Sequence, residues 1–164
     1  MQFEEKYDYP ASFETTWTMY QSTSFNESRF KEARLTDVTT EVVGDHNSAK
    51  VHVTAAVPAA SLPAVVSKVI QNDVQVDIEE NWSRTGDFTA NGTTKISVKG
   101  APVTLSAESV LSGDGSQATR VMVGELKVNI PILGRKLETE AMRLVPRIIG
   151  GEQKAAASWL EQSQ

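Results

Sequence analysis

The chain has 164 residues, no cysteine, and a formal net charge of −5 at pH 7 from 16 basic and 21 acidic side chains. This length predicts one domain, residues 1–164, which buries about 70% of the surface of the unfolded chain. The lack of cysteine excludes disulfides, thiolate metal sites and cysteine nucleophiles. The acidic balance argues against a nucleic-acid partner. Without a membrane-spanning apolar run or a secretory signal, the expected location is cytoplasmic.

The first part of the chain predicts a strand and two short helices. Residues 3–9 alternate apolar and polar side chains, which is typical of a half-buried strand. Ser12 suits the N-cap of a first helix. A second helix is expected to start at Asn26, with Phe25 and Phe30 placed as a hydrophobic staple.

The middle of the chain predicts six further strands and one short helix. The strands are expected at residues 38–44, 50–57, 74–82, 88–98, 103–111 and 118–129. The helix is expected over Leu62–Ile70 and includes Val69. Asn91-Gly92 is a strong hairpin signal. However, the inward-facing residues fall on even-numbered positions both before and after it, which favours one strand with a bulge or bend at Gly92. Short turns between successive strands predict an antiparallel meander.

The last stretch, Leu133–Gln164, predicts the long helix that covers this sheet. Its apolar residues recur at steps of four and three. Pro146, Gly150 and Gly151 disfavour an unbroken helix, so a kink or two successive helices are expected, with the break between Leu144 and Gly151. The fold class is therefore α+β. It is a helix-grip arrangement, with a curved seven-stranded antiparallel sheet around a kinked C-terminal helix, two short helices after the first strand and one mid-chain.

Several short segments resemble a known superfamily. They are Tyr9-Pro10-Ala11 leading into Trp17, Leu62-Pro63-Ala64, Trp82, residues 100–103 and residues 128–138, the last being the most specific. With the order of elements, they resemble the SRPBCC superfamily of START and birch-pollen-allergen-like proteins, and within it an actinobacterial family of unknown function. The resemblance implies a cavity between sheet and helix that accepts lipids, quinones, polyketides or other apolar molecules. It carries over no functional residues.

Two carboxylates stand out because they occupy strand positions that face the same side as the apolar residues of their strands. Glu5 and Glu80 would have their pKa values raised by desolvation if they faced a dry cavity, and they are the weak candidates for catalytic residues. The alternative is that both lie in water at strand ends. Asp77 and Glu79 have the opposite parity and suit a solvated face. The two histidines, His46 and His52, lack a patterned third donor, so no metal site is expected.

Aromatic residues, methionines and one leucine are the candidates for the wall of a ligand cavity. They are Trp17, Phe30, Trp82, Phe88, Met122, Met142 and Leu144. No cofactor fingerprint is present, and none is expected. The leading hypothesis is a carrier of a small apolar ligand without catalysis. The alternatives are a polyketide-cyclase-like enzyme that uses Glu5 or Glu80 as a base, and a protein-interaction or self-association module; the sequence leaves the oligomeric state open.

Overall fold

The structure is a computed structural model, and it describes residues 1–68 and 70–163. Val69 and Gln164, which the sequence places in predicted helices, lie outside the described residues. The strands are β1 (Gln2–Tyr9), β2 (Thr36–Gly44), β3 (Ser48–Val57), β4 (Val74–Gly86), β5 (Thr89–Val98), β6 (Val103–Gly113) and β7 (Ala118–Val128). The helices are α1 (Phe13–Tyr20), α2 (Thr23–Glu32), a 3₁₀ turn (Ala59–Ser61), α3 (Ala64–Ser67), α4 (Gly134–Met142) and α5 (Val145–Gln162).

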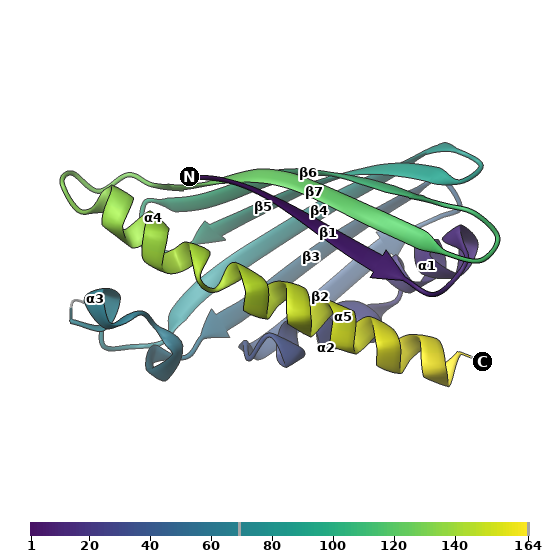
Figure 1. The fold of residues 1–164 in the computed structure, drawn as a ribbon. Helices are drawn as coiled ribbons and strands as arrows, with labels where there is room; N and C mark the ends of the chain where they lie inside the picture. The colour runs from purple at the N-terminus through teal and green to yellow at the C-terminus, as the bar shows by residue number, and fades with distance from the viewer. Residues whose placement is uncertain (69, 164) are drawn as a thin grey trace.

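The seven strands form one antiparallel sheet in the order β1-β7-β6-β5-β4-β3-β2. Strands β2 to β7 follow one another as a meander, and β1 forms the edge of the sheet beside β7. Figure 1 shows α4 and α5 running along one face of this sheet, with α2 beside α5. The predicted α+β helix-grip fold is confirmed. Its cause is visible in the strands, where buried side chains alternate with exposed ones along β3 and β4.

The predicted break in the C-terminal helix is present, but it lies at the N-terminal margin of the expected interval. Helix α4 ends at Met142 and α5 begins at Val145, so Pro146 occupies the first turn of α5, where a missing N–H costs nothing. Gly150 and Gly151 lie inside α5 and do not interrupt it. Gly151 is required for packing, since a Cβ atom there would be 2.8 Å from the backbone nitrogen of Ala33, next to α2.

One local prediction is wrong, and a second is right only in part. Helix α2 begins at Thr23 because Ser22 caps it, while Asn26 lies buried in the first turns and donates its side-chain amide to Tyr20 and Ser22 carbonyls. Strand β5 runs through Gly92 as one strand, as expected, but without a bulge there. Gly92 instead makes room for the ring of Trp82, which a Cβ atom would approach to 2.7 Å.

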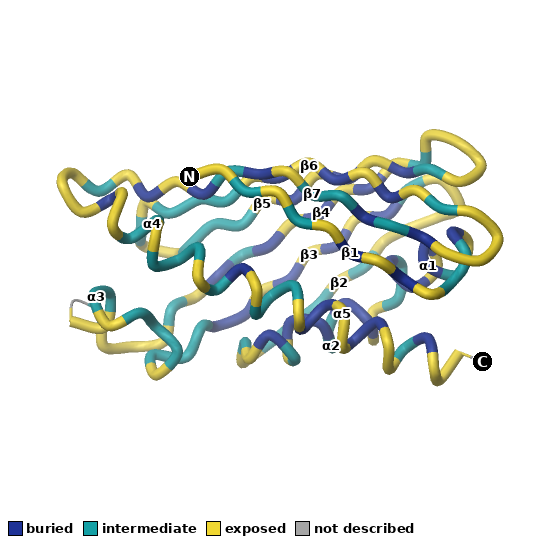
Figure 2. Tube along the Cα trace, in the orientation of Figure 1, coloured by how far each residue is buried: buried dark blue, intermediate teal, exposed yellow. Residues whose placement is uncertain are grey.

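The mid-chain helix is shorter than predicted. Among the described residues of this segment, only the turn Ala59–Ser61 and the four residues Ala64–Ser67 are helical, and neither contains a buried residue. Figure 2 shows that buried residues gather on α1, α2, α5 and the middle of the sheet, whereas α3 and α4 are mostly half-buried or exposed. The end of the sheet beneath α3 and α4 is therefore less tightly closed than the other end. Within the described residues, no helix has the length and apolar character needed to cross a membrane.

Candidate functional site

An apolar cavity of about 180 Å³ lies under α3 and α4 at one end of the sheet. Every described residue that lines it is apolar. The strands and their loops contribute Val57, Val74, Val76, Val98, Ala101, Val103, Val128 and Ile130. The mid-chain segment around α3 contributes Leu62, Pro63, Val66 and Ile70, and α4 with the residues after it contributes Leu137, Ala141 and Leu144. The alternating valines of β4, β5 and β6 supply its floor because the inward parity of these strands is apolar at this end.

A second cavity of about 50 Å³ follows the first along the same strands, beneath the start of α5. The next inward residues of β4, β5 and β6, namely Ile78, Ile96 and Leu105, line it. Leu144 contacts the larger cavity and Val145 the smaller one, so the break between α4 and α5 lies above the junction of the two. The two cavities together form a row between the sheet and the C-terminal helices.

Beyond the small cavity lies a cluster of four buried charges, which we call the ionic cluster: Arg29, Glu80, Arg120 and Glu152. They are only 0–4% exposed. Each arginine bridges both glutamates. Arg29 Nη2 is 2.5 Å from Glu80 and its Nη1 is 3.2 Å from Glu152, while Arg120 reaches each glutamate at 3.2 Å. The four residues come from α2, β4, β7 and α5, so the cluster joins the sheet to both covering helices.

Hydroxyl groups complete the hydrogen bonding of the two carboxylates. The Tyr9 and Tyr20 hydroxyls donate to Glu152 at 2.7 and 2.5 Å, and the Thr94 hydroxyl donates to Glu80 at 3.1 Å. Aromatic rings surround the guanidinium groups, with Trp82 5.0 Å from that of Arg120. Buried charges persist in proteins when they are paired and hydrogen-bonded in this way.

The pairing reverses the expected pKa shift of Glu80. Burial by itself raises the pKa, but the charges of Arg29 and Arg120 and their hydrogen bonds outweigh it and lower the pKa of Glu80 to about 2. Burial likewise raises the pKa of Glu152, and the attraction of Arg120 and Arg29 reverses this shift, leaving a net lowering. The expectation of a raised pKa at Glu80 is therefore wrong, because it considered burial without the two arginines that pair with this carboxylate. Both carboxylates are ionised at neutral pH.

The structure distributes the predicted site residues over different regions. Leu144 lines the larger cavity, and Phe30 and Met122 line the smaller one together with Glu80. Trp17 and Trp82 are buried in an aromatic core at the other end of the sheet, and neither they nor Met142 are among the residues lining the two cavities. Phe88 also lies away from the cavities; it is 48% exposed and packs edge-on against Phe13. Glu5 is half-buried on β1, opposite Met122 of β7.

Three members of the ionic cluster do not appear among the predicted site residues. Arg120 has the inward parity of Ala118 and Met122, the same signal that singled out Glu80. Glu152 follows Ile148 by four residues on the apolar face of α5, and Arg29 is placed similarly on α2. Two cations and two anions on otherwise apolar faces constitute a signal that could have been recognised, although their pairing is decided by the tertiary structure.

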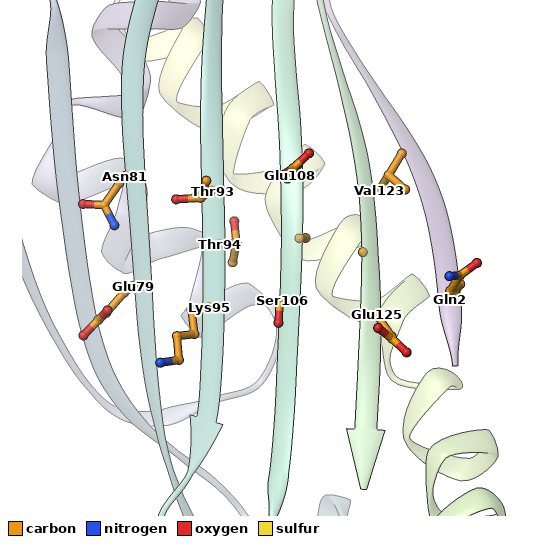
Figure 3. Close-up of a pocket in the computed structure, with 12 residues that line it drawn as sticks. Gln2, Glu79, Asn81, Thr93, Thr94, Lys95, Ser106, Glu108, Val123 and Glu125 are labelled. Carbon is orange, nitrogen blue, oxygen red and sulfur yellow. The ribbon is translucent and has the colours of Figure 1, made fainter.

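The outer face of the sheet carries a different kind of surface. Figure 3 shows a broad hollow there, over β4, β5, β6, β7 and β1, with polar and charged side chains that include Glu79, Lys95, Glu108 and Glu125. Its volume is about 590 Å³, and it is open to solvent along the strands. Its side chains are mostly exposed and carry charges of both signs, which does not provide the enclosed apolar wall of a small-molecule site.

Beside this hollow, His52, Asp77 and Glu79 place their ligand atoms within 4.8 Å of one another. The absence of a third donor beside His52, assumed from the sequence, is thus contradicted, since β3 and β4 pair in a register that brings the two carboxylates next to it. His52 Nε2 lies 3.0 Å from both carboxylate oxygens of Asp77. The hydrogen bond to Asp77 raises the pKa of His52. The ring nitrogen is therefore occupied by an exposed hydrogen bond to Asp77, which a metal ion would have to displace.

Comparison with known proteins identifies the family and the fold. A family described as a protein of unknown function (DUF2505) matches residues 4–160. Uncharacterised proteins of Mycobacterium tuberculosis and Mycobacterium bovis are each 26% identical to this chain over 168 residues, covering 96% of this chain and 95% of theirs. These matches confirm the resemblance to a family of unknown function.

Solved structures with little sequence identity share the fold. A Thermus thermophilus protein has a TM-score of 0.58 at 14% identity, over 96% of this chain and 98% of its own. A START superfamily protein from Mycobacterium smegmatis has a TM-score of 0.57 at 8% identity, over the same shares of the two chains. At such identities the likeness concerns the fold alone, and it confirms the START-like helix-grip arrangement.

Proposed function

The chain belongs to the DUF2505 family, and on this premise we propose that it binds a small apolar molecule in the cavity under α3 and α4. The observation that carries the proposal is the lining of this cavity, in which every contributing side chain is apolar. A dry apolar cavity of about 150 Å³ is known to accept benzene, so about 180 Å³ accommodates a ring of that size. The half-buried helices α3 and α4 form the thin wall through which such a molecule would pass.

The charges of the ionic cluster favour binding without catalysis. A general base needs a pKa near the working pH and a free lone pair directed at its substrate. Glu80 has a pKa of about 2, and its two oxygens accept hydrogen bonds from Arg29, Arg120 and Thr94. Glu152 is held in the same way by both arginines. The carboxylates of the ionic cluster are therefore unsuited to proton abstraction.

Filling the cavity tests the proposal. Ala141 of α4 lines the cavity, whereas Thr139 of the same helix is exposed, so Ala141→Phe and Thr139→Phe add the same ring on the inside and on the outside. The probe is butylbenzene, titrated into ¹⁵N-labelled protein and followed by amide chemical shifts. We expect Ala141→Phe to weaken binding at least ~10-fold, because its ring occupies the ligand's volume, and Thr139→Phe to bind like the unmodified chain. Absence of butylbenzene binding, or equal binding by the two variants, would refute the proposal.

A further inference from the structure

The small cavity beside the ionic cluster combines an apolar wall with one polar end. Ile78, Ile96 and Leu105 of the sheet and Ile148 and Ile149 of α5 form most of the wall. The polar end is formed by side chains on β1, α2, β4, β5 and α5, namely Tyr7, Arg29, Glu80, Thr94 and Glu152. A molecule that extended from the larger apolar cavity into this one would therefore meet polar groups only at its leading end.

Two polar groups at this end lack hydrogen-bond partners among the described residues. Arg29 Nε is buried and has none, although the Nη atoms of the same guanidinium bind Glu80 and Glu152. The Tyr7 hydroxyl also makes no hydrogen bond within the described part of the chain, although its ring packs against Arg120. A buried donor without a partner is unfavourable, so a ligand oxygen that accepts a hydrogen bond here is favoured.

The charge balance of the ionic cluster determines which kind of ligand oxygen can bind beside it. The two positive charges of the arginines balance the two negative charges of the glutamates, and all four residues are buried. A carboxylate or an ammonium group brought to this place would be a fifth buried charge without a counter-ion. An alcohol or a carbonyl adds no charge, and its oxygen can still accept hydrogen bonds from Arg29 Nε and from the Tyr7 hydroxyl.

The spacing of the two cavities sets the shape of the molecule. Val76 lies at the larger cavity and Glu80 at the polar end, four residues apart on β4. Four residues of an extended strand span ~13 Å. A ligand that fills the larger cavity and reaches the ionic cluster is therefore elongated, with the larger apolar part at the α4 end.

We propose that the ligand is an elongated apolar molecule with one uncharged oxygen, an alcohol or a carbonyl, which binds Arg29 Nε and the Tyr7 hydroxyl. This inference rests on the proposed function, because it assigns the chemical class of the molecule bound in the same row of cavities. It adds a polar recognition site at the buried end of that row.

A matched series of phenylbutyl compounds tests the inference on the full chain. Butylbenzene, 4-phenyl-1-butanol, 4-phenylbutanoate and 4-phenylbutylammonium share the apolar part and differ only at the end that would reach the ionic cluster. Dissociation constants come from ¹⁵N amide shifts at pH 7 for the unmodified chain and for Tyr7→Phe. We expect the alcohol to bind at least 10-fold more tightly than either charged compound. We also expect Tyr7→Phe to weaken the alcohol about 3- to 10-fold while leaving butylbenzene unchanged.

A direct measurement accompanies the variant. The Arg29 Nε–H resonance is expected to shift when the alcohol binds and to stay in place with butylbenzene, since only the alcohol offers an acceptor. The inference would be overturned if Tyr7→Phe changed the binding of butylbenzene and of the alcohol equally, or if a charged compound bound more tightly than the alcohol. Either result would leave the proposed function standing. Absence of binding by butylbenzene itself would instead refute the proposed function.

Discussion

Removal of one charge from the ionic cluster is expected to destabilise the fold strongly. In Glu152→Gln the side chain keeps its shape and an oxygen that accepts from Tyr9 and Tyr20. Its amide nitrogen, however, must face a guanidinium donor, because Arg29 and Arg120 approach opposite carboxylate oxygens at 3.2 Å. Two buried cations then share the single anion Glu80. Breaking a buried ion pair by removing one partner destabilises by ~3–5 kcal/mol, and we expect a loss in this range.

Urea denaturation followed by tryptophan fluorescence measures this loss. Exposed Glu161 on the same helix gives the matched control Glu161→Gln, expected to change the free energy of unfolding by less than ~0.5 kcal/mol. In the double variant Arg29→Met with Glu152→Gln, charge balance returns because Arg120 and Glu80 remain paired. The double variant should therefore lose at least ~1 kcal/mol less than the sum of the single variants. A loss below ~1 kcal/mol for Glu152→Gln, or strict additivity in the double variant, would contradict this reasoning.

The packing of α5 and the acid stability of the protein yield two more predictions. Gly151→Ala is expected to destabilise by ~2 kcal/mol, because its Cβ would lie 2.8 Å from Ala33 backbone, while Gly150→Ala, with nothing within 4 Å, should stabilise by ~0.5–1 kcal/mol through helix propensity. Thermal unfolding of the pair checks this, and melting temperatures that change in the same direction would disprove the packing argument. Folding lowers the pKa of Glu80 from 4.5 to about 2, so its ionised carboxylate contributes roughly 3 kcal/mol to the free energy of unfolding above pH 4.5. This contribution is lost as the pH falls from 4.5 through about 2. Urea midpoints between pH 7 and 2.5 should fall accordingly, and Glu80→Gln should flatten this dependence.

The break between α4 and α5 connects the fold to the proposed site. Leu144 and Val145, at this break, line the two cavities in turn, and Pro146 fixes the start of α5 immediately after them. Helix α5 is anchored by Glu152 in the ionic cluster and by the close approach of Gly151 to α2. Helix α4 has no such buried anchor apart from Gly134 among its described residues. The part of the cover above the apolar cavity is thus the less tightly held part.

Local patterns in the sequence determined the fold. Alternation along the strands and the apolar stripe of Leu133–Gln164 depend only on period, so they indicated the sheet, its meander and its covering helix without knowledge of contacts. Pro146 located the helix break to within a few residues for the same reason, since its steric effect is local. The inward position of Glu80 also followed from parity alone.

Only the tertiary structure decided what surrounds that inward face. The partners of Glu80 are Arg29, 51 residues before it, and Arg120, 40 residues after it. Such pairings depend on how the sheet register and the helix docking bring distant segments together. The sign of a pKa shift in a dry interior depends on those partners, because burial and a paired charge act in opposite directions. The row of cavities likewise arises from volume left between packed elements, which no period in the sequence encodes.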